Sequence, residues 1–279
     1  MSRSYLTEKR ILLSGQHPLP VYLLRPTLRR KPPAQTPGIL WIHGGGYVTG
    51  MAKMIYFSRA LNLVKQYGAV VLTPEYRLAP KAPYPAALED CYTALLALKD
   101  HAAEWGINPA KLMVGGESAG GGLAAAVCMY ARDKGEVNIA FQMPLYPMLD
   151  DRDTDSSRDN HGHVWNTKRN HYGWRAYLAE RYGKEVSPYA APARQTDYTG
   201  LPPAYTFVGD GEPFYCETLT YIQNLKEAGI PAKADVYHSS VHAFDMLLPF
   251  RKVSRQAIRA FEQQYLYAAR HFHAEQKQR

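Results

Sequence analysis

The sequence predicts one α/β domain built on a mostly parallel β-sheet with helices on both faces. Short apolar runs, typical of buried strands, alternate along the chain with longer segments whose apolar residues recur at helical spacing. The 279 residues are 46% hydrophobic and 12% aromatic, which is enough to bury one large core. We therefore expect residues 1–279 to form a single domain, with a small cap insertion at about residues 150–201.

The chain is expected to begin with two short antiparallel strands. Lys9–Ser14 and Val21–Arg25 are apolar-rich runs separated by turn residues. The segment Pro26–Pro37 is basic and rich in proline, which predicts a connector. Most residues that precede the main sheet are thus expected to form strands.

Strands and helices then alternate in the order that favours a parallel sheet. The expected strands are Gly38–Ile42, Ala69–Thr73, Ala140–Leu145, Ala204–Val208 and Lys233–Tyr237. The expected helices are Ile55–Gln66, Ala86–His101, Ala119–Lys134, Tyr172–Arg181, Glu217–Ala228 and Lys252–His273. In the middle of the chain, Lys111–Gly122 predicts a strand, a tight turn and a helix start.

The pattern changes between Asp150 and about Leu201, which is polar and rich in Asp, His, Trp and Tyr. Because this insertion follows the carboxyl end of a strand, it suits a lid or a pocket wall. Trp165, Tyr172 and Trp174 either line that pocket or seal the insertion onto the core.

Composition argues against several classes of function. The net charge is +8, but the basic residues are scattered, so we expect no nucleic-acid binding. No N-terminal run resembles a signal peptide, and none approaches the roughly 18 apolar residues of a membrane span, so we expect a cytoplasmic protein without stable membrane association. The three cysteines are widely spaced, which favours reduced thiols. His161 and His163 fit no recognised metal-site spacing, and no metal or cofactor is expected.

Gly116–Gly120 has the G-x-S-x-G spacing of a nucleophile elbow. In such a turn the glycines let strand and helix approach closely, while a strained serine exposes its hydroxyl. Ser118 is therefore the candidate nucleophile of a serine hydrolase.

A serine hydroxyl needs a general base, which a carboxylate in turn orients. His242 follows the last predicted strand and has small neighbours, so we assign it as the base; His238 is a structural alternative closer to the strand. Asp210 and Glu212 both follow the preceding strand, and local chemistry does not choose between them.

His43–Gly46 follows a strand and is a candidate oxyanion hole. Consecutive glycines let the backbone approach a substrate without interference from Cβ atoms, and backbone N–H groups stabilise developing negative charge. The N–H of Ala119, at the start of the helix after the elbow, is a further expected donor. A phosphate-binding loop is disfavoured because the run lacks a following G-K-[S/T].

With these motifs the chain resembles the bacterial hormone-sensitive-lipase-like carboxylesterases, a group of α/β-hydrolases marked by H-G-G-G and G-[D/E]-S-A-G-G. The resemblance covers about residues 37–250. Further segments similar to the family are Tyr76–Pro80, Tyr84–Asp90, Ser187–Ala190 and Leu201–Ala204.

The resemblance implies an α/β-hydrolase fold and a Ser-His-acid esterase in which Ser118 and His242 are nucleophile and base. The family's acid position falls on Glu212, which favours it over Asp210 although the family more often has aspartate there. By the same correspondence, Gly45 and Gly46 are the oxyanion donors of the glycine run. The family's usual helical N-terminal cap is largely missing, since only about 37 residues precede the H-G-G-G strand.

The expected activity is hydrolysis of short-chain carboxylic esters through an acyl-enzyme, with a small-molecule ester as partner and a homodimer as a possible assembly. Two alternatives stay open. An amidase or arylformamidase would use the same triad on a C–N bond, and a non-catalytic small-molecule receptor would use the same fold.

Overall fold

The computed structural model describes residues 4–27 and 35–277, and in this part of the chain eight strands form one sheet in the order β1-β2-β4-β3-β5-β6-β7-β8. The pairs β1–β2 and β2–β4 are antiparallel, and every later pair is parallel. The strands are β1 (Tyr5–Ser14), β2 (His17–Pro26), β3 (Gly38–Ile42), β4 (Val70–Pro74), β5 (Leu112–Glu117), β6 (Phe141–Leu145), β7 (Ala204–Gly209) and β8 (Ala232–Tyr237).

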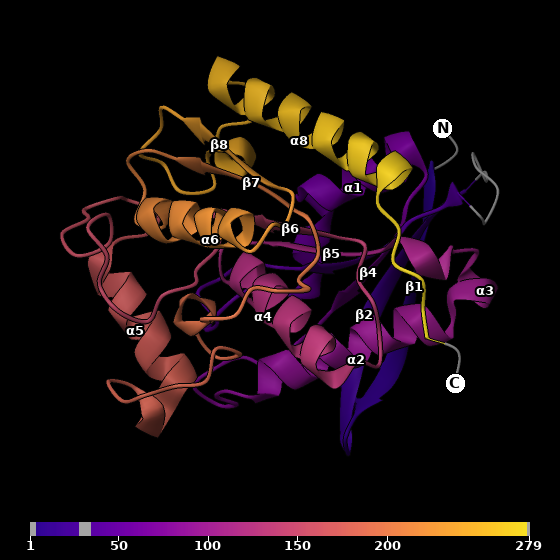
Figure 1. Ribbon diagram of the computed structural model, residues 1–279, viewed down its shortest axis with the longest axis horizontal. Helices are drawn as coiled ribbons and strands as arrows, with labels where there is room; N and C mark the ends of the chain where they lie inside the picture. The colour runs from indigo at the N-terminus through magenta and orange to yellow at the C-terminus, as the bar shows by residue number, and fades with distance from the viewer. Residues whose placement is uncertain (1–3, 28–34, 278–279) are drawn as a thin grey trace.

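Helices cover both faces of the sheet (Figure 1). The α-helices are α1 (Arg59–Tyr67), α2 (Ala86–Asp100), α3 (Ala102–Trp105), α4 (Ala119–Lys134), α5 (Thr167–Leu178), α6 (Tyr215–Glu227), α7 (Phe244–Leu247) and α8 (Lys252–His271). Short 3-10 helices are η2 (Ala52–Tyr56), η3 (Pro109–Lys111), η4 (Ala179–Arg181) and η5 (Pro192–Arg194). The predicted fold class is confirmed.

The core consists of two apolar layers, one on each side of the sheet. Leu95, Leu123 and Ile222 belong to the layer under α2, α4 and α6, whereas Leu63 and Phe261 belong to the layer under α1 and α8. All residues of β3 and β5 are buried, as expected for strands covered on both faces. The two central strands are therefore rigid supports for whatever follows their carboxyl ends.

Several predicted boundaries are wrong. The hairpin strands β1 and β2 have ten residues each, because a two-residue turn at Gly15, with φ +59°, lets pairing continue to the turn itself. The predicted helix Ile55–Gln66 is divided, since Ser58 accepts a hydrogen bond from the Ala60 N–H and starts α1 anew. The middle of the predicted connector Pro26–Pro37, residues 28–34, lies outside the described residues.

The insertion between β6 and β7 also differs from its prediction. Its helix α5 begins at Thr167 rather than near Tyr172, because Asn166 caps it by accepting a hydrogen bond from the Arg169 N–H. In Figure 1 this segment lies to one side of the sheet, away from α8.

Candidate active site

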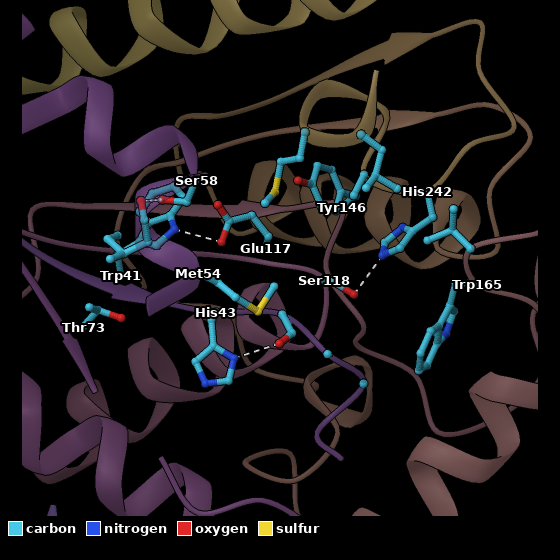
Figure 2. A pocket seen from close by; sticks show the side chains of 18 residues that line it. Trp41, His43, Met54, Ser58, Thr73, Glu117, Ser118, Tyr146, Trp165 and His242 are labelled. Carbon is cyan, nitrogen blue, oxygen red and sulfur yellow. Dashed lines mark hydrogen bonds between the residues drawn. The ribbon is translucent and has the colours of Figure 1, made fainter. Parts of the chain in front are cut away.

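The predicted site residues come together at the carboxyl edge of the sheet. Ser118 follows β5, the glycine run follows β3, Glu212 follows β7 and His242 follows β8. In an open α/β sheet this edge is where loops from separate strands converge around a crevice. Figure 2 shows Ser118 and His242 facing each other within the pocket lining.

Ser118 occupies a strained turn between β5 and α4. Its backbone has φ +57° and ψ −122°, a conformation that L-residues rarely adopt. Gly116 and Gly120 permit it, because a Cβ on Gly116 would lie 2.4 Å from the Gly120 oxygen and one on Gly120 would lie 2.2 Å from the Ile42 oxygen. The hydroxyl is thereby held at the apex of the turn.

The His242 imidazole bridges the serine and a carboxylate. The Ser118 hydroxyl donates to Nε2 of His242 over 2.8 Å, and Nδ1–H donates to Oε2 of Glu212 in a short hydrogen bond. All three side chains are buried. This is the arrangement in which a histidine can take a proton from a serine while a carboxylate fixes its tautomer.

The structure places the two candidate acids in different pairs. Glu212 is fully buried, and its Oε1 accepts from the Gly209 N–H over 2.8 Å. Asp210 instead pairs with the exposed His238 over 2.9 Å, and its other oxygen accepts from the Ser239 N–H. Of the two carboxylates, Glu212 is the one that contacts His242.

The glycine run lies against the elbow. A Cβ on Gly44 would lie 3.2 Å from the Ser118 Cβ, and Gly45 and Gly46 have φ values of +126° and +60°. A Cβ on Gly46 would also lie only 2.0 Å from the Trp165 ring. Within the described part of the chain, the N–H groups of Gly45, Gly46 and Ala119 donate to no backbone acceptor in the turns, loops and caps.

His43 supports this loop as a neutral side chain. Its Nδ1–H donates to the Gly44 oxygen over 2.8 Å, and its ring stacks on Tyr76 at 4.2 Å. The Tyr76 hydroxyl donates to the His43 oxygen. Burial lowers the pKa of His43 to about 4, against the opposing effect of the Gly44 hydrogen bond, so the imidazole is uncharged at neutral pH.

A cavity of about 210 Å³ opens beside Ser118. Trp165 of the insertion forms part of its wall, whereas Trp174 is buried against Tyr47 and Tyr177, and Tyr172 is 59% exposed. Of the three aromatic candidates, Trp165 is therefore the one that lines the pocket. The lining is mostly apolar and comprises Trp41, His43, Gly44, Gly45, Gly46, Met54, Ile55, Ser58, Thr73, Glu117, Ser118, Tyr146, Val164, Trp165, His242, Ala243, Met246 and Leu247.

Two aromatic side chains that the sequence analysis did not identify pack against the His242 imidazole in edge-to-face contacts. Tyr146 and Phe214 lie at 5.2 and 5.0 Å from the His242 ring, at interplanar angles of 83° and 81°. Tyr146 directly follows β6 and Phe214 directly precedes α6, so both stand at the same sheet edge as the predicted residues. That position is the signal by which they could have been found.

The described residues offer neither a metal site nor a membrane-spanning helix. Among them no group of three or more His, Cys, Asp or Glu side chains is arranged to hold a metal ion. No helix in residues 4–27 and 35–277 is long and apolar enough to cross a membrane.

Several known proteins resemble this chain in sequence and fold. Residues 39–246 match the family described as the alpha/beta hydrolase fold. The curated relatives include Esterase LipI and Carboxylic ester hydrolase LipN, both of Mycobacterium tuberculosis. LipI is 32% identical over 213 residues, covering 76% of this chain and 66% of its own length. LipN is 32% identical over 216 residues, covering 75% of this chain and 57% of its own length.

A solved structure titled Bacterial Heroin Esterase superposes with a TM-score of 0.87 and 34% identity, covering 96% of this chain and 84% of that chain. This chain spans about two thirds or less of the length of the two curated relatives. The match covers most of the chain in fold as well as in sequence. The chain belongs to the α/β-hydrolase-fold family, in its hormone-sensitive-lipase-like group, as its motifs indicated.

Proposed function

We propose that this chain is a serine carboxylesterase that hydrolyses short-chain carboxylic esters through an acyl-enzyme. The observation that carries the proposal is the continuous contact from the Ser118 hydroxyl through both nitrogens of His242 to the buried Glu212 carboxylate. The names of the relatives LipI and LipN support the same class of reaction.

In the acylation half, Ser118 Oγ attacks the ester carbonyl carbon while its proton passes to Nε2 of His242. The tetrahedral intermediate then collapses, the bond to the alcohol oxygen breaks, and the alcohol leaves with the proton from Nε2. Glu212 accepts the Nδ1–H hydrogen bond throughout and so favours the imidazolium form that exists between these steps.

In the deacylation half, water gives a proton to Nε2 and attacks the acyl carbon. The bond to Ser118 Oγ breaks, the serine recovers its proton, and the carboxylic acid is released. The N–H groups of Gly45, Gly46 and Ala119 are the proposed donors to the oxyanion in both halves. Loss of one such donor typically costs about 3 kcal/mol of transition-state stabilisation.

The size of the cavity supports a preference for short acyl chains. At about 210 Å³ it is smaller than the roughly 300–1,000 Å³ of pockets that take drug-sized ligands. Trp41, Thr73 and Glu117 border it on the side away from Trp165 (Figure 2). A long acyl chain would have to displace these packed side chains.

A panel of p-nitrophenyl esters of increasing acyl length tests the proposal. We expect the highest kcat/KM for the short esters, and we expect Ser118→Ala to lower turnover on the order of 10⁶-fold. Near-normal turnover by Ser118→Ala would refute the mechanism. Hydrolysis of p-nitroanilides faster than of the matched esters would instead support an amidase.

A further inference from the structure

A second group of buried ionisable side chains lies behind the proposed triad and takes no part in the steps above. It consists of Glu117, Asp245 and Arg59, with the Tyr146 hydroxyl, and we call it the buried charge cluster. Both carboxyl groups are buried, and the Arg59 side chain is 11% exposed. Burying an unpaired charge costs folding free energy, so a cluster of buried ionisable groups beside the site suggests a role in function.

The ion pair of the cluster joins α1 to α7. Arg59 Nε lies 3.3 Å from Asp245 Oδ2, and Asp245 is fully buried. Burial raises the pKa of Asp245, while the Arg59 charge and then the Tyr146 hydroxyl oppose that rise. Arg59 stands at the first position of α1, and Asp245 lies in the four-residue helix α7. The pair therefore ties a short helix to a longer one.

Helix α7 matters because it begins two residues after His242. The residue between them, Ala243, has φ +57° and ψ +38°, a left-handed conformation that costs a non-glycine residue free energy. A strained residue persists only when its neighbours are held on both sides. On the N-terminal side His242 is held by Glu212, and on the C-terminal side Asp245 is held by Arg59.

Tyr146 connects the same cluster to the imidazole itself. Its ring packs edge-on against His242, and its hydroxyl opposes the rise in the pKa of Asp245. Tyr146 also has a positive φ, +34°. Asp245 is thus connected to His242 by two routes, through Tyr146 at the ring and through α7 at the backbone, in addition to the hydrogen bond from Nδ1 to Glu212.

Asp245 does not act on the substrate directly. It is fully buried and lies outside the residues that line the cavity, as does Arg59. Any influence on the reaction must therefore pass through His242, Tyr146 or α7.

We propose that Arg59 and Asp245 are a positioning pair that holds His242 at hydrogen-bonding distance from Ser118. This inference rests on the proposed function, because it assigns the pair to the esterase reaction of the same site.

Glu117, the third member, accepts a hydrogen bond from Trp41 Nε1 over 2.8 Å and forms the end of β5 next to the nucleophile. Burial, followed by the nearby Asp245 charge, raises the pKa of Glu117 to about 8, so this carboxyl is largely protonated at neutral pH. Protonation of Glu117 removes a negative charge from beside Asp245 and leaves Arg59 and Asp245 as the ion pair of the cluster.

The test compares steady-state kinetics of Asp245→Asn, Arg59→Met and Arg59→Lys with wild type on a short p-nitrophenyl ester. We expect Asp245→Asn and Arg59→Met to lower kcat by roughly 10–100-fold with KM changed less than about threefold, because small displacements of a base act on the chemical step. Arg59→Lys should recover a large part of kcat, since it restores the charge. The rate of phosphonylation by a fluorophosphonate should fall in parallel with kcat, while its final stoichiometry stays at one.

Asp151→Asn is the matched control. Asp151 is also a buried carboxylate, 2% exposed in its side chain, and pairs with Arg194 over 2.8 Å in the insertion. This variant is expected to lower the melting temperature while leaving kcat within about twofold of wild type.

The inference would be overturned if folded Asp245→Asn had the kcat of wild type. It would also be overturned if kcat fell equally in Asp151→Asn. If Asp245→Asn does not fold, the two arginine variants decide, and equal kcat in Arg59→Met and Arg59→Lys refutes the inference. An inactive wild type would refute the proposed function itself, whereas an active wild type with insensitive variants refutes the pair alone.

Discussion

Two histidine–carboxylate pairs lie at the carboxyl edge of this sheet, in neighbouring positions of the same two loops. They have the same chemical groups but differ in burial and in their other contacts. His238 pairs with Asp210 through Nδ1, and His242 pairs with Glu212 through the same atom. The side chains of the first pair are 100% and 40% exposed, whereas those of the second are 5% and 0% exposed. Both acids follow β7 and both histidines follow β8.

The comparison shows that burial and the partner at the far nitrogen distinguish the proposed base from a surface ion pair. The Nε2 of His242 accepts from Ser118, and aromatic rings pack against the imidazole from two sides. The exposed pair instead links two loops, since the Asp210 carboxylate also accepts from the Ser239 N–H. An exposed pair of this kind is screened by water and contributes little.

The largest difference in kcat between the two pairs is expected when their histidines are replaced. His242→Ala should lower kcat on the order of 10⁶-fold, because the serine loses its only base and the members of a triad act as a unit. His238→Ala should stay within about threefold of wild type. Steady-state hydrolysis of p-nitrophenyl acetate measures both, and a comparable loss in the two variants would contradict the distinction.

Replacing the two acids should also give different kcat values, with a smaller difference than for the histidines. Glu212→Gln keeps the shape but removes the charge that fixes the His242 tautomer, so kcat should fall about 10⁴-fold. Asp210→Asn serves as the matched control at the exposed pair and should leave kcat nearly unchanged. A larger loss in Asp210→Asn than in Glu212→Gln would reverse the assignment of the acid.

The glycine run allows a third test with an internal control. Gly46→Ala should lower kcat about 10²-fold, because the new Cβ meets the Trp165 ring and shifts a proposed oxyanion donor. Gly15→Ala has nearly the same backbone strain, φ +59° against +60°, but its Cβ would meet nothing within 4 Å. It should lower the melting temperature without changing kcat, and an equal kcat loss in both variants would leave strain, not the donor, as the cause.

The smallest expected effect is the pH dependence of the exposed pair. The hydrogen bond from His238 lowers the pKa of Asp210 below its ordinary 3.8, and the bond to Asp210 raises the pKa of His238 above its ordinary 6.5. The carboxylate contribution is lost as pH falls through the lowered value, and the histidine contribution is lost as pH rises through the raised value. The pair therefore stabilises the fold mainly between about pH 4 and 6.5.

Thermal melts of wild type and Asp210→Asn across pH 4–8 measure this effect. The difference in melting temperature should be small, largest near pH 5, and should vanish towards pH 8. A difference that does not change with pH would show that Asp210 stabilises its loop through neutral hydrogen bonds alone.

The same two pairs show how far the sequence predicts this site. Ser118 and His242 could be assigned because a glycine elbow and a strand end are local patterns. The choice between Asp210 and Glu212 depended on family resemblance, since the direction of each side chain is set by contacts such as that of Gly209 N–H with Glu212 Oε1. The position of Tyr146 directly after β6 places it at the correct sheet edge, but its packing on His242 joins residues almost a hundred positions apart, which no local pattern shows.

The fold was predictable for a similar reason. Buried strands such as β3 and β5 are continuous apolar runs, so their existence and order follow from local pattern. The break at Ser58 and the start of α5 depend on single capping side chains, which periodicity does not detect. The anchoring of α7 depends on a contact between Asp245 and Arg59, whose positions in the chain are far apart.

The central claim is that Ser118 is a nucleophile activated by His242. Incubation with a fluorophosphonate probe, followed by intact mass measurement and peptide mapping, tests it without assuming any substrate. We predict one adduct per chain on Ser118, no adduct in Ser118→Ala, and adduct formation slowed in step with kcat in His242→Ala while His238→Ala reacts like wild type. An unmodified wild-type chain, or an adduct on another residue, would contradict the account.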